Sequence, residues 1–170
     1  MLLDRFRWVD GHADLWHVFR APQALATVIT ALADPYRDAA LSAVVGVESR
    51  GFLLGAAVAV ELGVGFVAVR KPGSLFPGRK LRETTTTDYR GNTTELLLQA
   101  DALQPGDRVV LVDDWIETGA QAAATARLVG AAGAELVGVS VIVDELDDAV
   151  RAELPVIRSL LTAAELPGEA

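Results

Sequence analysis

The 170-residue sequence contains no cysteine. Without a thiol, the protein can have no disulfide framework, no thiolate nucleophile and no Cys-ligated zinc or iron–sulfur site. Histidine is nearly as scarce, since only His12 and His17 are present, five residues apart. That spacing does not bring two metal ligands onto one face of a helix. We therefore expect both histidines to have packing or surface roles.

Long hydrophobic runs are also missing. The most apolar stretch, residues 52–60, is followed by Glu61 and is far shorter than the ~20 residues that a membrane-spanning helix requires. The start of the chain lacks the apolar core of a secretory signal peptide. We therefore expect a soluble, cytoplasmic protein.

Positive charge is in deficit. Lysine and arginine number 15 against 23 acidic residues, a net charge of −8, so non-specific binding of nucleic acid is not expected. The deficit is uneven, because residues 70–90 carry a net charge of +4 and the rest of the chain −12. One basic segment on an acidic protein suits a small polyphosphate ligand.

The sequence does contain a substantial core. Hydrophobic residues make up 51% of the chain and charged residues 22%, which excludes a disordered protein, and the length predicts one domain over 1–170. Periodicity predicts two strand–helix–strand units, which build an open, mostly parallel α/β sheet with helices on both faces. The units are expected at 43–47, 51–62 and 65–70, and at 107–114, 119–133 and 135–144.

Two regions show no hydrophobic periodicity. Residues 71–92 contain two prolines and three glycines, and a loop of that length in a compact domain is usually functional. We expect it to be flexible. Residues 1–20 are irregular as well, whereas residues 21–33 are predicted to form a helix behind Pro22.

The segment VVLVDDWIETGAQ at 109–121 carries the strongest chemical signal. Its apolar strand ends in Asp113 and Asp114, at the edge where open α/β sheets bind ligands. Thr118 and Gly119 then open a helix whose free N–H groups form an anion site. This pattern suits a phosphate-bearing sugar, with the helix start on the phosphate and the carboxylates on ribose hydroxyls and, through water, on a magnesium ion. The alternative is an acidic turn with a threonine cap.

This segment resembles the phosphoribosyl-pyrophosphate motif of type I phosphoribosyltransferases. Residues 44–73 and 95–114 are similar to the matching parts of adenine phosphoribosyltransferases, so the likeness covers roughly residues 41–144. The resemblance implies magnesium-assisted transfer of a 5-phosphoribosyl group to a nucleobase, a purine with adenine favoured, and release of pyrophosphate. It also implies a homodimer, a hood over residues 1–35 that contacts the base, and a flexible loop over 71–92.

The same resemblance assigns roles to individual residues. ESRG at 48–51 resembles the family's pyrophosphate loop, in which an often cis peptide turns backbone N–H groups inward. Binding of phosphoribosyl pyrophosphate is expected at Ser49, Arg50, Arg70, Lys71, Lys80, Asp113, Asp114, Thr118, Gly119, Ala120 and Gln121, and the metal site at Asp113 and Asp114. Catalytic roles are expected for Asp88, Tyr89 and Glu117.

The sequence departs from the adenine enzymes in three places. Asp88–Tyr89 replaces a Glu–Tyr pair, with Arg90 inserted after it, and KPGSLFPG at 71–78 is one residue longer than usual. Glu117 stands where adenine enzymes have a small residue and where oxopurine and orotate enzymes often have Asp. The base therefore stays open. A non-catalytic regulator that senses phosphoribosyl pyrophosphate is the alternative function.

Overall fold

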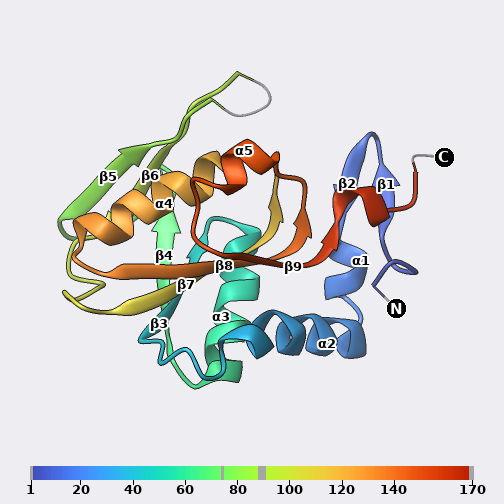
Figure 1. Ribbon diagram of the computed structural model, residues 1–170, viewed down its shortest axis with the longest axis horizontal. Coiled ribbons are helices and arrows are strands. Elements are labelled where there is room, and N and C mark those ends of the chain that lie inside the picture. The colour runs from blue at the N-terminus through green and yellow to red at the C-terminus, as the bar shows by residue number, and fades with distance from the viewer. Residues whose placement is uncertain (1, 74, 88–90, 169–170) are drawn as a thin grey trace.

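A seven-stranded sheet forms the centre of the computed structural model, which describes residues 2–73, 75–87 and 91–168 (Figure 1). Its strand order is β5-β6-β4-β3-β7-β8-β9. The five strands from β4 to β9 run parallel, and β6 and β5 add antiparallel at one edge. The expected open, mostly parallel α/β sheet is thus confirmed. The bounds are β3 (Ala43–Val47), β4 (Gly65–Arg70), β5 (Lys80–Thr84), β6 (Glu95–Gln99), β7 (Arg108–Ile116), β8 (Glu135–Asp144) and β9 (Ile157–Thr162).

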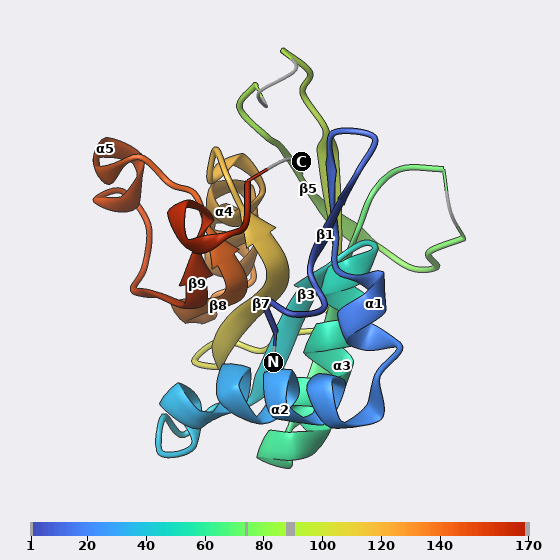
Figure 2. The same ribbon diagram turned by 90° about the vertical axis from the view of Figure 1, so that its right-hand side faces the viewer.

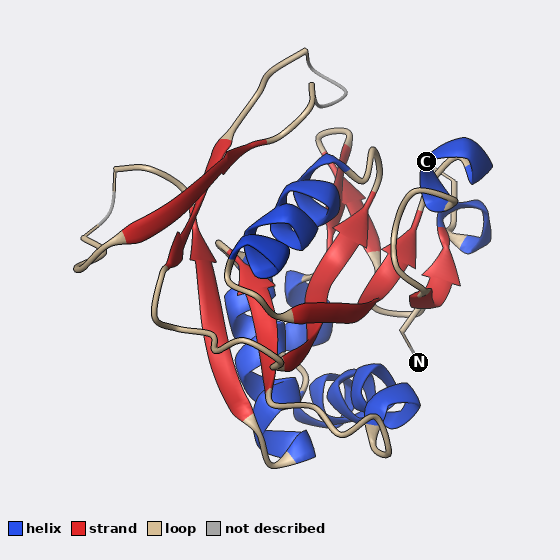
Figure 3. Cartoon of the chain, turned by 60° about the vertical axis from the view of Figure 1, so that its left-hand side comes forward, coloured by secondary structure: helices blue, strands red, loops and turns tan. Residues whose placement is uncertain are grey.

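Helices cover both faces of the sheet (Figure 2 and Figure 3). On one face lie α2 (Pro22–Ala33) and α3 (Arg50–Leu62), and on the other lies α4 (Ala120–Ala131). Along β3, Val44 packs into the cluster that includes α2 and α3, and Val45 into the cluster that includes α4. Because successive strand residues point to opposite faces, a strand covered on both sides must be apolar throughout. This explains why residues 43–47 are apolar without alternating polar residues.

The N-terminal region is more regular than expected. Two short strands, β1 (Arg7–Val9) and β2 (His12–Asp14), form an antiparallel hairpin that precedes α1 (Trp16–Phe19). The turn between the strands is made by Asp10 and Gly11, which both have positive φ, as tight two-residue hairpin turns require. Three-residue strands are too short to show a period, so the expectation of an irregular segment over 1–20 was wrong.

The long loop predicted over residues 71–92 is also interrupted by structure. Within it, β5 pairs with β6, and Arg82 on β5 forms an ion pair with Glu95 on β6 at 2.8 Å. The prediction of one continuous loop was therefore wrong for residues 80–84. Strand β5 lies at the sheet edge and owes its conformation to β6, a partner that the local sequence does not specify.

The smaller elements complete the chain. The 3₁₀ helix η1 (Asp34–Tyr36) follows α2, α5 (Asp148–Arg151) follows β8, and η2 (Ala163–Glu165) follows β9. In the part of the chain that the structure describes, no helix has both the length and the apolar character needed to cross a membrane.

Two glycines let β3 and the start of α3 approach each other closely. A Cβ atom at Gly46 would overlap the carbonyl oxygen of Gly51 and lie 2.9 Å from the ring of Phe66. A Cβ atom at Gly51 would lie 3.2 Å from a carboxylate oxygen of Asp113. The start of α3 can therefore lie against the ends of β3 and β7, because neither glycine has a side chain.

This close approach predicts a contrast between two glycine substitutions. Gly46→Ala is expected to lower the free energy of unfolding by about 1–3 kcal/mol or more, because backbone must move to admit the methyl group. Gly130→Ala is the control, since a Cβ at this exposed position on α4 meets nothing within 4 Å and should stabilise by about 0.5 kcal/mol. Urea unfolding measures both values, and equal effects would contradict the proposed backbone contact.

Candidate active site

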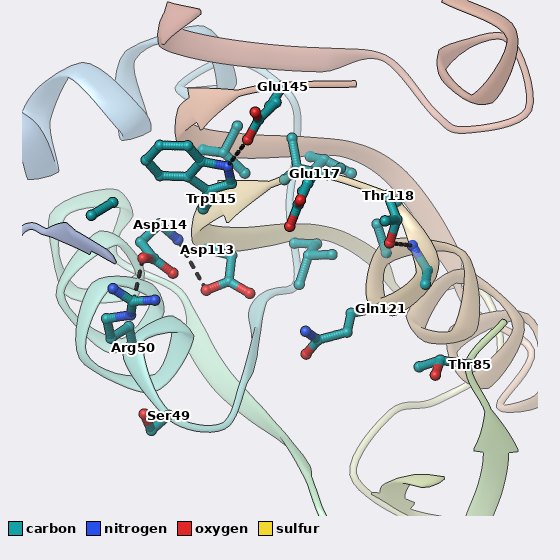
Figure 4. A pocket seen from close by; sticks show the side chains of 18 of the residues that line it. Ser49, Arg50, Thr85, Asp113, Asp114, Trp115, Glu117, Thr118, Gln121 and Glu145 are labelled. Atoms are coloured by element: carbon teal, nitrogen blue, oxygen red, sulfur yellow. Dashed lines mark hydrogen bonds and ion pairs between the residues drawn. The ribbon is translucent and has the colours of Figure 1, made fainter. Parts of the chain in front are cut away.

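A cavity of about 680 Å³ opens at the carboxyl ends of β3 and β7 (Figure 4). Segments far apart in the sequence contribute to it, because parallel strands bring their ends to one edge of the sheet. The lining includes Trp8, Gly11, His12, Ala13, Glu48, Ser49, Arg50, Lys71, Thr85, Thr94, Asp113 to Ala122 and Glu145.

The two adjacent carboxylates predicted from the sequence lie at the centre of this cavity. Asp114 is buried, with 5% of its surface exposed, and its backbone N–H donates to Asp113 Oδ1 at 2.9 Å. Arg50 Nε lies 3.0 Å from Asp114 Oδ2 as an ion pair. That oxygen nevertheless accepts no well-aligned hydrogen bond from the described residues. A buried acceptor without such a bond is costly, so the site favours a ligand that donates hydrogen bonds.

Electrostatics reinforces this preference at Asp113. Burial raises the pKa of its carboxyl group well above the ordinary value, and the neighbouring Asp114 carboxylate raises it further. Both effects disfavour the charged form. Sugar hydroxyls or metal-bound water that donate to the pair would relieve this cost.

The start of α4 forms one end of the cavity. Gly119 caps the helix in the left-handed conformation with φ of 68°, and a Cβ there would lie 2.9 Å from Val150. Thr118 Oγ1 accepts a hydrogen bond from the Ala120 N–H at 3.4 Å, and Gln121 also lines the cavity. The first turn of a 12-residue helix thus presents its N–H groups and the positive end of its dipole, which suits a phosphate group.

The opposite side is built from the segment between β3 and α3. The peptide bond between Glu48 and Ser49 is cis, as the resemblance implied. Ser49 and Arg50 line the cavity there, and Lys71 joins them from the end of β4. These three residues bring hydroxyl, guanidinium and ammonium donors to one side, an arrangement suited to a polyphosphate.

Two other basic residues predicted for this site do not line the cavity. The guanidinium of Arg70 contacts Glu48 through Nε–Oε2 at 3.3 Å and Nη2–Oε1 at 3.2 Å, and it lies over the rings of Phe52 and Phe76. Lys80 Nζ donates to the carbonyl oxygen of Gly78 at 3.0 Å. Asp88 and Tyr89 lie outside the described residues.

Glu48 organises this side and was missed from the sequence. Besides Arg70, its Oε2 accepts the backbone N–H of Lys71 at 3.1 Å. These hydrogen bonds, from Arg70 first and Lys71 second, lower the pKa of the Glu48 carboxyl group. Glu48 therefore connects the cis peptide to the segment that carries Lys71.

Glu117 lines the cavity between Trp115 and Thr118, and Figure 4 shows its side chain pointing inward. In the sequence, Glu117 was singled out only because it directly precedes Thr118 and Gly119 of the motif. His12 also lines the cavity, whereas His17 pairs with Asp14 through Nδ1–Oδ2 at 2.8 Å. No cluster of three or more metal-ligating side chains occurs among the described residues.

Comparisons with known proteins agree with this geometry. A family model described as phosphoribosyl transferase domain matches residues 17–162. The adenine phosphoribosyltransferase of Desulfitobacterium hafniense (strain Y51) is 42% identical over 131 residues, which are 77% of this chain and 74% of that protein.

Solved structures give the same picture. The adenine phosphoribosyltransferase from Rhodothermus marinus DSM 4252 superposes with a TM-score of 0.85 at 37% identity, covering 95% of this chain and 96% of that one. The enzyme from Saccharomyces cerevisiae, complexed with an imino-altritol bisphosphate and adenine, gives 0.82 at 33% identity, covering 94% and 96%. The resemblance inferred from the sequence is confirmed.

The raised pKa of Asp113 predicts that Asp113→Asn stabilises the free protein at pH 7. Ionising a group whose folded-state pKa exceeds its unfolded-state pKa costs folding free energy at every pH above the folded-state value. The gain should shrink as the pH falls through the raised pKa and vanish toward 3.8, the ordinary value. Urea unfolding between pH 7 and pH 4 measures it, with the exposed Asp101→Asn as control. A gain that does not change with pH would contradict the assignment.

Proposed function

The chain belongs to the phosphoribosyl transferase domain family and is a phosphoribosyltransferase, and we propose that its substrates are phosphoribosyl pyrophosphate and adenine. The reaction joins a ring nitrogen of the base to C1 of the sugar and releases pyrophosphate, as in purine salvage. The observation that carries this proposal is the pair Asp113 and Asp114, set between the start of α4 and the loop at Ser49 and Arg50. This order suits a sugar that bears a phosphate at one end and pyrophosphate at the other.

Different residues of the cavity bind different parts of the substrate. The N–H groups at Thr118, Gly119, Ala120 and Gln121 bind the 5′-phosphate, and the Asp113–Asp114 pair binds the ribose hydroxyls. Ser49, Arg50 and Lys71 bind pyrophosphate. A positively charged sugar develops as the leaving group departs, so the protein acts by positioning and by neutralising charge, and it needs no covalent nucleophile.

The same carboxylates fit a magnesium ion. Asp114 has a buried oxygen without an aligned hydrogen bond, and carboxylate oxygens are the ligands that magnesium prefers. Two carboxylates are fewer than an all-protein cage requires, and magnesium usually keeps several waters, so Asp113 and Asp114 would hold the ion through its water shell. Bound there, magnesium would neutralise part of the charge of the pyrophosphate group.

The choice of base follows from the relatives. The relatives described above are named adenine phosphoribosyltransferases, and at 33–42% identity they cover most of this chain. The alternative of a non-catalytic regulator is not favoured, because these relatives are named as enzymes. Glu117 is the one unusual group near the base, and its carboxylate would accept the ring proton as the base nitrogen attacks C1.

We further propose a cytoplasmic homodimer. Leu53 and Val60 lie seven residues apart on α3, and 39% and 81% of their surfaces are exposed. Residues at this spacing share a helix face, so they offer an apolar strip for a second copy. Sedimentation velocity tests this, since a monomer at micromolar concentration would contradict it.

The reaction itself is tested by pyrophosphate release with a panel of bases. We expect turnover with adenine, phosphoribosyl pyrophosphate and magnesium, and no comparable rate with hypoxanthine, guanine or orotate. Changing Asp113 and Asp114 together to Asn should weaken binding of magnesium–phosphoribosyl pyrophosphate at least tenfold, since charge-assisted contacts are worth about 1.5–3 kcal/mol each. Asp101→Asn is the control for calorimetry, and unchanged affinity in the double variant would overturn the site assignment.

The proposed role of Glu117 predicts a loss of turnover rather than a loss of binding. Glu117→Ala should lower kcat by roughly 10²-fold, the scale of general-base catalysis, and leave the affinity for phosphoribosyl pyrophosphate nearly unchanged. Glu117→Gln should be impaired to a similar degree, because an amide oxygen accepts a hydrogen bond but takes no proton. Wild-type turnover in both variants with a slightly lower Tm would mean that Glu117 only stabilises the start of α4.

A further inference from the structure

One end of the cavity has an aromatic wall. Trp115 follows the carboxylate pair directly on β7, and its indole Nε1 donates a hydrogen bond to Glu145 Oε2 at 2.8 Å (Figure 4). Glu145 follows β8, and its backbone N–H donates to the carbonyl oxygen of Ile116 at 2.9 Å. The ends of β7 and β8 are therefore joined by a backbone and a side-chain hydrogen bond at the same place.

A second indole extends this wall. Trp8, on β1, meets Trp115 edge-on, with ring centroids 6.5 Å apart and an interplanar angle of 66°. Phe6 also packs edge-on against Trp8, with ring centroids 5.2 Å apart and an interplanar angle of 87°. Trp8 Nε1 donates to the carbonyl oxygen of Pro167 at 2.6 Å, so the C-terminal segment holds the second ring. Figure 1 shows these segments close together, with β1 and β2 beside the end of the chain.

The hydrogen bonds of the two indoles decide what the wall can offer a ligand. An indole has a single N–H donor and no acceptor. Trp115 donates to Glu145 and Trp8 donates to Pro167, so neither donor is available to a substrate. What remains is flat ring surface, which suits contact with a planar heterocycle.

The rest of the lining is suited to other parts of the substrate. The start of α4, the Asp113–Asp114 pair and the side formed by Ser49, Arg50 and Lys71 are polar or charged, and the phosphate, ribose and pyrophosphate account for them. The ring of Trp115 lies on the remaining side, beyond Asp114 from Ser49 (Figure 4). A base attached at C1 must leave the ribose in a direction that these groups do not occupy.

We propose that Glu145 is a positioning residue for the purine base, and that it acts by holding the ring of Trp115 in place. The inference rests on the proposed function, since Trp115 is the residue that borders the base there. Glu145 suits this role because its segment is firmly held. The preceding Asp144 is buried and pairs with Arg151 through two hydrogen bonds, at 2.7 and 3.0 Å. Glu145 itself is exposed, so its contribution is the hydrogen bond to a half-buried ring.

The experiment separates positioning from direct contact with the base by using the full chain and steady-state kinetics. Glu145→Ala removes the acceptor, and we expect the KM for adenine to rise about fivefold, as for the loss of one hydrogen bond, with the KM for phosphoribosyl pyrophosphate within twofold of wild type. Glu145→Gln retains an oxygen acceptor and should bring the KM for adenine back to within about twofold. Glu153→Ala removes an exposed carboxylate outside the lining and is the matched control.

A double-mutant cycle then tests the route through Trp115. Trp115→Phe keeps an aromatic face but has no N–H donor, so adding Glu145→Ala to it should change the KM for adenine by less than twofold. Equal losses in the two Glu145 variants would instead indicate that its charge touches the base, and equal increases in both KM values would indicate a general structural role. Each of these results, or wild-type kinetics in Glu145→Ala, would overturn the proposal.

Tryptophan fluorescence keeps this test independent of turnover. Trp16 is exposed and does not line the cavity, so the Trp16→Phe background removes its emission and leaves the two wall residues. Purine binding should quench this emission, and most of the quenching should disappear in Trp115→Phe. If the wild-type protein turns over no base, the proposed function fails, and quenching by a purine still decides whether the wall binds one. No quenching by any base would overturn the inference.

Discussion

The placement of two neighbouring carboxylates, one buried and one half-buried, at the end of an apolar strand is the constraint on which the site depends. Asp114 is almost fully buried, and burial together with its charge raises the pKa of Asp113. Charges placed in this way are tolerated only where other groups compensate them. The guanidinium of Arg50 supplies part of this compensation. The free protein thus carries an unfavourable arrangement that a ligand donating hydrogen bonds would relieve.

Close backbone packing sets the geometry of that arrangement. Gly46 and Gly51 allow α3 to begin almost against β3, and this places Arg50 within reach of Asp114. A side chain at either glycine would push the helix start away from the strand ends. Glu48 secures the same turn from the other side through Arg70 and the backbone of Lys71. The side of the cavity proposed for pyrophosphate therefore owes its geometry to two glycines and to Glu48.

The sequence predicts those parts of the molecule whose determinants are local. Strands β3, β4 and β8 have the predicted bounds, because a short apolar run rich in β-branched residues is a local signal. Asp113 and Asp114 were found because they are adjacent in the motif. Strand β5 was missed because its conformation depends on pairing with β6. Trp8 and Glu145 could not be placed in the cavity, since only the fold brings residues 137 positions apart to one wall. Arg70 does not line the cavity, and the sequence does not reveal that Glu48 is the partner of its side chain.

The two ends of the cavity are built from different chemical groups and from different segments of the chain. In the proposed arrangement, phosphate and ribose are bound by backbone N–H groups and carboxylates at the end of β7 and the start of α4, which the family motif encodes. The proposed base end is built from the N-terminal hairpin, Trp115, the segment after β8 and, through Pro167, the C-terminal segment. Glu117 differs from the adenine-enzyme pattern, whereas the carboxylate pair and the Thr118–Gly119 start of α4 keep the motif. A chain of this family can therefore change how it holds a base without rebuilding the machinery that activates phosphoribosyl pyrophosphate, and this chain departs from the adenine-enzyme pattern at Glu117, at that end of the cavity.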